Sequence, residues 1–194
     1  MKTENMYIVW AHPRSDSLTA QVVDAIRSRS MRAGINVTTL DLYRNGFNPV
    51  LDTEDEPEWG NPGKTHSDEV QYFFGELMSN DTLVVVYPVW WYSFPAILKG
   101  YLDRVFNYGL AYGGGHTLPV KKIRWVALVG GTKESYIEHG WNNAMNNILT
   151  SMAHYVGVED SNALLLYNTL NKNDDDSVYQ KLMFNVNVLV DELS

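Results

Sequence analysis

The stretch around residues 83–86 constrains the fold of this chain most. Its sequence, Leu-Val-Val-Val, is an uninterrupted aliphatic run, and such runs are typical of a parallel strand buried on both faces. Pro88 ends the strand because proline has no N–H group to donate to a neighbour. A helical pattern over residues 96–107 follows, with Ser93 expected near its cap and Pro95 in its first turn. The stretch therefore predicts a strand, a loop and a helix in succession.

The same alternation recurs along the whole chain, which has one predicted helix in each crossover. Apolar residues at Leu18, Val22, Ala25 and Ile26 share one face of a helix that Asp16 or Ser17 can cap. This order predicts an α/β fold: a flavodoxin-like, three-layer, doubly wound parallel sheet in the order 2-1-3-4-5. We expect a single domain over residues 1–194. The predicted strands are 6–11, 36–42, 83–86, 123–129 and 160–167, and the other helices 70–78, 141–156 and 177–193.

Composition excludes several classes of protein. The net charge of −8 and the absence of Lys or Arg runs argue against a nucleic-acid partner. No apolar window is long enough to span a membrane, and the N-terminus lacks the features of a signal peptide. The chain contains no cysteine, which excludes disulfides and thiolate metal sites. We therefore expect a cytoplasmic protein without a metal site.

The turn after the first strand has the residues for a phosphate site. It carries neither the G-x-G-x-x-G pattern of dinucleotide-binding folds nor a P-loop. Instead, His12, Ser17 and Thr19 surround the start of a helix, where free N–H groups attract anions. Ser17 is equally well explained as a helix cap.

Two further loops face the same crevice. The loop from Pro88 to Phe94 contains an aromatic cluster that can cover a flat heterocycle, although core packing explains any one aromatic residue alone. Gly130 and Gly131 permit close approach of a planar ring, and Tyr136 can donate a hydrogen bond to a developing oxyanion. An ordinary turn with a surface tyrosine is the alternative.

The region 43–66 has no periodicity and is rich in acidic residues. Connections of this length in a compact domain often serve as lids, binding loops or arms. A solvated loop is an equally good interpretation.

Taken together, these motifs resemble the NAD(P)H:quinone oxidoreductases of the DT-diaphorase type. The resemblance follows family order over about residues 6–140. It implies a homodimer that carries one flavin per subunit, at a site shared between subunits. The matching stretches are Ala11-His12 through Ser17, Asp41-Leu42-Tyr43, Phe47-Asn48-Pro49, residues 94–100, residues 103–106, residues 109–112 and residues 130–136.

The resemblance also implies which residues bind the flavin. The flavin phosphate or pyrophosphate is expected at His12, Ser17, Leu18 and Thr19. Tyr108 and Tyr112 are expected in the wall of the substrate pocket. The expected ring contacts are Pro88, Val89, Trp90, Trp91 and Tyr92 on one side and Val129, Gly130, Gly131 and Tyr136 on the other.

The chain departs from the family pattern in several places. Thr19 replaces a common Asn, and Leu128-Val129 replaces a pair of threonines. Asn142 stands where the animal enzymes have a histidine, so His139 is a candidate substitute or else a surface residue. The acidic loop is shorter than in those enzymes, which leaves FMN as an alternative to FAD.

The implied function is two-electron reduction of quinones or similar flat electrophiles by NAD(P)H in a ping-pong cycle. Tyr136, with His139, is the expected catalytic group. Two alternatives remain: a regulatory flavoprotein subunit of a potassium efflux system, and a flavodoxin-like carrier of single electrons.

Overall fold

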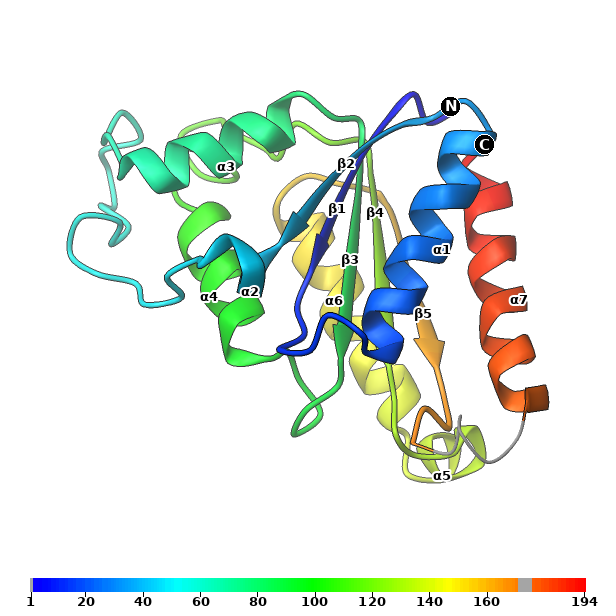
Figure 1. Cartoon of the computed structure of the whole chain (residues 1–194). Helices are drawn as coiled ribbons and strands as arrows, with labels where there is room; N and C mark the ends of the chain where they lie inside the picture. The colour runs from blue at the N-terminus through cyan, green and yellow to red at the C-terminus, as the bar shows by residue number, and fades with distance from the viewer. Residues whose placement is uncertain (1, 171–175) are drawn as a thin grey trace.

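The architecture is a five-stranded parallel sheet between two layers of helices. The computed structural model describes residues 2–170 and 176–194. The strands lie in the order β2-β1-β3-β4-β5 (Figure 1), which confirms the predicted order. The strands are β1 (Asn5–Trp10), β2 (Asn36–Asp41), β3 (Thr82–Pro88), β4 (Lys122–Leu128) and β5 (Asp160–Leu166). The helices are α1 (Leu18–Arg32), α2 (Leu42–Asn45), α3 (Asp68–Met78), α4 (Ala96–Val105), α5 (Lys133–Glu138), α6 (Trp141–Tyr155) and α7 (Asp176–Leu193).

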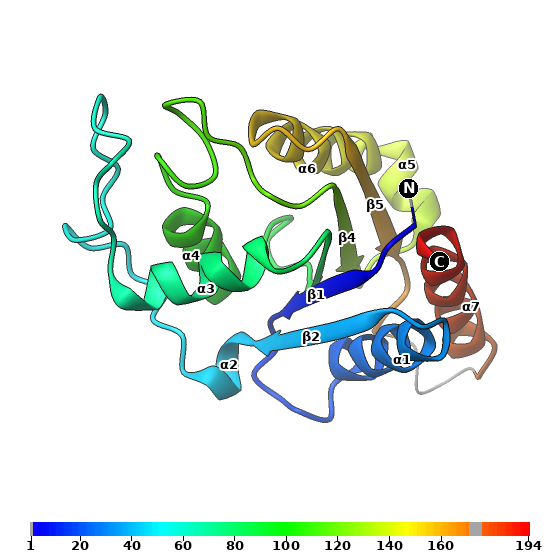
Figure 2. The same cartoon turned by 90° about the horizontal axis from the view of Figure 1, so that it is seen from above.

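The two faces of the sheet carry separate apolar cores. Helices α1 and α7 cover one face, and α3, α4 and α6 cover the other (Figure 2). On the central strand β3, Val84 and Val86 point into the first core, whereas Leu83 and Val85 point into the second. Each side chain of the run is therefore buried, because successive residues of a strand point to opposite faces.

Some local predictions differ from the structure. Pro95 is the N-cap of α4 and not part of its first turn, and no side chain caps this helix. Helix α4 ends at Val105, so Asn107 lies beyond it. Short α2 and α5 were not predicted, because four to six residues are too few to show a helical period. None of the helices within the described residues is long and apolar enough to cross a membrane.

A buried ion pair anchors the acidic loop between α2 and α3. Asp55 is fully buried, and both Nε and Nη2 of Arg104 on α4 donate to its Oδ2. Ser67, the N-cap of α3, donates its N–H and its hydroxyl to the same carboxylate. Burial opposes ionisation of Asp55, but the bonds from Ser67 and Arg104 outweigh it and hold the pKa of Asp55 below its usual value.

Other contacts hold the same loop against the rest of the chain. Lys64 Nζ donates to the carbonyl oxygens of Thr53 and Glu56, and so closes the loop on itself. A Cβ atom on Gly109 would lie 2.3 Å from the carbonyl oxygen of Pro62, so the glycine permits close packing there. The loop is thus a fixed arm whose other acidic residues, such as Glu54 and Glu58, face solvent.

The Asp55–Arg104 pair yields a stability prediction. Replacing Arg104→Met should lower the free energy of unfolding by about 3 kcal/mol, because it leaves a buried carboxylate without its cation. Arg29→Met is the matched control, because it removes a partly exposed pair with Asp191 and should cost much less stability. Urea denaturation measures both changes. Equal losses for the two variants would contradict the anchoring role of Asp55.

Candidate active site

Three predicted loops meet at the carboxyl edge of the sheet, at the lower end of Figure 1. The rings of His12, after β1, and Trp90, after β3, have centroids 6.2 Å apart. The rings of Tyr92, after β3, and Tyr136, after β4, also lie 6.2 Å apart. This edge includes the point between β1 and β3 where the strand order reverses, and open α/β sheets bind ligands there.

The first loop leads into the N-terminus of α1. Ser17 is its N-cap, and its Oγ accepts a hydrogen bond of 3.2 Å from the N–H of Ala20. The N–H groups of Leu18 and Thr19 belong to the first turn, where no carbonyl of the same helix can accept them. No acidic residue lies in that turn, so the positive end of the helix is not neutralised from within the helix. Leu18 and Thr19 are both buried.

The imidazole of His12 is held in one orientation by the backbone of its own loop. The N–H of Arg14 lies 3.1 Å from Nδ1 and can donate to it, whereas the Arg14 carbonyl lies 3.3 Å from the same nitrogen and can accept a proton from it. Burial, together with the positive charges of Arg14 and Arg44, lowers the pKa of His12. If Nδ1 accepts in the shorter contact, a neutral ring carries its proton on Nε2 and can donate it to a ligand; if Nδ1 donates to the carbonyl, the proton lies on Nδ1.

The second loop contains a tight two-residue turn made of aromatic residues. Trp90 and Ser93 exchange both backbone hydrogen bonds, at 3.1 and 3.0 Å. The central residues Trp91 and Tyr92 have φ of 50° and 58°, a conformation that normally favours Gly or Asn. Trp91 is 96% exposed, so its ring contributes little to the core and projects from the edge of the sheet. Val89 extends the sheet, since its N–H donates to Leu128.

The third loop begins at Val129, which is buried and continues the ladder beside β5 through a bond from its N–H to Leu166. A Cβ atom on Gly130 would lie 3.0 Å from the side chain of Leu170, and one on Gly131 would lie 3.1 Å from the ring of Tyr136. Intramolecular packing therefore explains why both positions are glycine, in addition to any role toward a ligand.

Tyr136 is the most buried of the predicted site residues with a titratable side chain. It is 6% exposed and lies on α5, within ring-contact distance of Tyr92, Trp141 and Tyr167. Burial, followed by the neighbouring Tyr92 and Tyr167, raises the pKa of Tyr136. Its hydroxyl is therefore protonated at neutral pH and is a hydrogen-bond donor.

Two aromatic residues at this edge were not predicted as site residues. Trp141, the first residue of α6, stacks on His139 at 4.4 Å and also contacts Tyr92. Tyr167 follows β5 directly and contacts Tyr136. Their positions immediately after Gly140 and after the fifth strand were the available signals in the sequence. His139 itself is exposed, and its Nδ1 donates to the Ser135 carbonyl at 2.8 Å. Its ring contacts Trp141, which in turn contacts Tyr136.

Tyr108 and Tyr112 lie apart from these loops within one chain. The ring of Tyr112 is 5.3 Å from that of Tyr155, at the C-terminal end of α6. Trp141 marks the opposite end of the same helix, about 20 Å away at 1.5 Å per residue. Trp59 from the acidic arm packs edge-on against Tyr108 at 5.1 Å and was not predicted. The predicted substrate residues therefore form a separate aromatic cluster.

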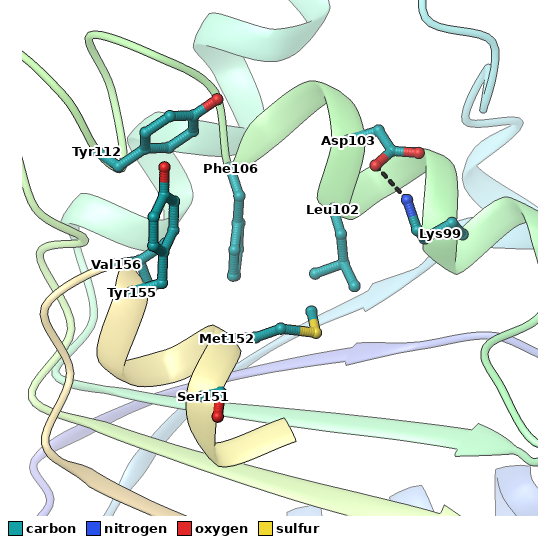
Figure 3. Close-up of a pocket in the computed structure, with 9 residues that line it drawn as sticks. All are labelled: Lys99, Leu102, Asp103, Phe106, Tyr112, Ser151, Met152, Tyr155 and Val156. Carbon is teal, nitrogen blue, oxygen red and sulfur yellow. Dashed lines mark hydrogen bonds and ion pairs between the residues drawn. The ribbon is translucent and has the colours of Figure 1, made fainter. Parts of the chain in front are cut away.

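A groove of about 450 Å³ runs between α4 and α6 beside this cluster. Figure 3 shows Phe106, Tyr112 and Tyr155 at one end and the Lys99–Asp103 ion pair at the other. Leu102, Met152 and Val156 complete an apolar lining. Among the described residues, no group of three or more His, Cys, Asp or Glu side chains could hold a metal ion.

The family model for a flavodoxin-like fold matches residues 4–183. The chain belongs to this family.

The chain is 54% identical, over the full length of both chains, to an uncharacterized NAD(P)H oxidoreductase, YcaK, from Escherichia coli. It is 29% identical to the human ribosyldihydronicotinamide dehydrogenase [quinone], over 79% of this chain and 75% of that protein. The NAD(P)H:quinone oxidoreductase from Methanothermobacter marburgensis superposes with a TM-score of 0.86 at 26% identity, over 97% of this chain and 96% of that one. These similarities confirm the resemblance found in the sequence.

The aromatic turn yields a prediction on stability. Trp91→Asn should raise the free energy of unfolding by about 0.5–1 kcal/mol, because asparagine tolerates a positive φ and little buried surface is lost. Trp59→Asn is the control: Trp59 is also largely exposed but is not among the residues with positive φ, so that change should not stabilise the chain. Urea denaturation of both variants measures the difference. A destabilised Trp91→Asn variant would mean that the turn is not strained.

Proposed function

We propose that this chain is a flavin-dependent NAD(P)H oxidoreductase that reduces quinones, or similarly flat electrophiles, by two electrons. One observation carries the proposal. A helix N-terminus with no acidic residue in its first turn, an exposed aromatic turn and a buried tyrosine converge on one edge of the sheet. The names of the similar proteins, two of which are quinone reductases, support the same activity.

The residues at this edge fit the polar end of a flavin. A phosphate is expected on the N–H groups of Leu18 and Thr19, at the positive end of α1. The hydroxyl of Ser17 and Nε2 of His12 would add neutral donors. FAD is the expected cofactor and FMN the alternative. Both carry a phosphate that could bind at this position.

The other two loops fit the flat ring. We assign its contacts to Pro88, Val89 and the turn Trp90–Tyr92 on one side, and to Val129, Gly130 and Gly131 on the other. The exposed ring of Trp91 offers an apolar face against which a planar acceptor can stack. A bound flavin would supply the redox chemistry, which is hydride transfer from NAD(P)H to the acceptor.

Tyr136 is proposed as the residue that stabilises charge during turnover. Its raised pKa keeps the phenol protonated, so that it donates a hydrogen bond to an oxygen on which negative charge develops. His139 is proposed to assist indirectly, because its ring stacks on Trp141, which in turn contacts Tyr136.

The decisive experiment is a visible spectrum of the purified protein, followed by mass identification of any released flavin. We expect bound flavin that is bleached by NAD(P)H and restored by a quinone, with parallel double-reciprocal plots. A colourless protein that binds neither FAD nor FMN would refute the proposal. Transfer of single electrons only would support the carrier alternative, and activity only with a transporter would support the regulatory one.

Removing the hydroxyl of Tyr136 tests its role directly. Tyr136→Phe should lower kcat for quinone reduction by about tenfold to a hundredfold and leave flavin affinity nearly unchanged, because one oxyanion donor is worth at most about 3 kcal/mol. Tyr72→Phe, at an exposed tyrosine on α3, is the matched control. Steady-state kinetics at saturating NAD(P)H measure the change. An unchanged kcat would remove Tyr136 from the mechanism.

We also propose that the protein is a homodimer, because one chain separates its two aromatic clusters. Trp141 and Tyr155 occupy the two ends of α6, and Ile148, 59% exposed, stands at the midpoint between them. A two-fold axis near Ile148 would place antiparallel copies of α6 against each other. It would then bring Tyr112 and Tyr155 of one subunit toward Trp141 and Tyr136 of the other, as an isologous interface requires.

The dimer proposal predicts the effect of a charge at the centre of α6. Ile148→Asp should convert the dimer to a monomer, because two carboxylates would face each other across the axis. Ile137→Asp is the control, since Ile137 is similarly exposed but lies on α5. Sedimentation equilibrium gives the mass of each variant. A wild-type protein that is monomeric at all concentrations would contradict the proposal.

A further inference from the structure

Arg44 on α2 connects the loop after β1 with the end of β2, which the proposed function does not otherwise link. Its Nη1 donates to the carbonyl oxygen of Pro13 at 2.7 Å, and its Nη2 donates to that of His12. Its guanidinium carbon lies 5.2 Å from the centroid of the Trp10 ring. The planar group therefore packs on Trp10, the last residue of β1, and binds the carbonyl groups of His12 and Pro13.

Asp41 holds Arg44 in place. Asp41 is the N-cap of α2, and its Oδ1 accepts the N–H groups of Tyr43 and Arg44. Its Oδ2 accepts Nε of Arg44 at 2.5 Å. Asp41 is also paired in register with Trp10 across β1 and β2. Its carboxylate therefore lies at the level of the sheet where the first loop begins.

The contacts of Arg44 reach the imidazole of His12 through one peptide. The carbonyl of Pro13 points to Arg44, and the N–H of the same peptide, which belongs to Arg14, donates to His12 Nδ1 at 3.1 Å. Because C=O and N–H of a trans peptide point in opposite directions, fixing the carbonyl fixes the donor. The Arg14 carbonyl competes for Nδ1 at 3.3 Å, so the orientation of the Pro13–Arg14 peptide decides how strongly the proton of His12 is biased toward Nε2.

We infer that Arg44 is a positioning residue that acts through the Pro13–Arg14 peptide to lock His12 with its proton on Nε2, facing the flavin phosphate. This inference rests on the proposed function. The fork of a guanidinium suits the task, because it donates to two carbonyl groups and to Asp41 from fixed positions. The ammonium of lysine cannot reproduce that geometry.

The first test needs no flavin. In the ring ¹⁵N spectrum of the flavin-free protein, His12, identified by comparison with His12→Ala, should show the widely separated shifts of a single neutral tautomer. In Arg44→Gln and Arg44→Lys the separation should shrink as both tautomers become populated. An unchanged spectrum in both variants would overturn the inference. Circular dichroism and a thermal melt confirm that each variant is folded.

The second test compares FMN with riboflavin, which lacks the phosphate. Arg44→Gln should weaken FMN binding about tenfold, as expected for losing one charge-assisted hydrogen bond, and change riboflavin affinity less than about twofold. Arg27→Gln is the matched control, because it removes the same charge from an exposed position on α1. Equal weakening by both variants, or equal loss for both ligands, would overturn the inference.

A double-mutant cycle then asks whether Arg44 acts through His12. The variant His12→Ala with Arg44→Gln should bind FMN no more weakly than His12→Ala alone. Additive losses would overturn the route through His12. A wild-type protein that binds neither FMN nor riboflavin would refute the proposed function itself. A wild type that binds FMN, with Arg44→Gln binding equally well, would refute the inference about Arg44 alone.

Discussion

The parallel alignment of the five strands is the constraint on which the candidate site depends. Parallel strands end at the same edge, so the loops after β1, β3 and β4 meet there although up to 120 residues of sequence separate them. The same alignment points the N-terminus of α1 at that edge, where its dipole favours an anion. The adjacent aromatic turn then offers a face for a planar group. The proposed phosphate site and the proposed ring site are therefore neighbours because of the topology.

Two arginines hold two of the loops in place. Arg44 ties the first loop to Asp41 at the end of β2, and Arg104 on α4 ties down the acidic arm through its buried Asp55. Both guanidinium groups bind backbone carbonyls as well as carboxylates, which orients peptides as well as side chains. Loops held in this way present their side chains without support from a helix or a strand. Trp59 on the acidic arm and His12 on the first loop are the examples.

Much of the fold could be predicted from the sequence because its signals are local. The aliphatic run at β3 and the apolar periods of α1, α3 and α6 depend on nearest neighbours along the chain, and all of these elements are present. Asp55 could not be distinguished from the exposed acidic residues around it, because its partner Arg104 is 49 residues away. Trp141 falls within the predicted helix 141–156, and only its position beside Tyr92 places it at the candidate site.

The sequence by itself determined the order of strands and helices, the loops in which ligand-binding residues gather, and the membership of the flavodoxin-like family. These follow from local composition and spacing, which folding does not alter. The tertiary structure decided which side chains meet. It placed Tyr136 among aromatic rings that raise its pKa, and it set Tyr108 and Tyr112 at the far end of α6 from that ring. Such contacts arise from three-dimensional packing between distant residues, and no periodicity along a single chain encodes them.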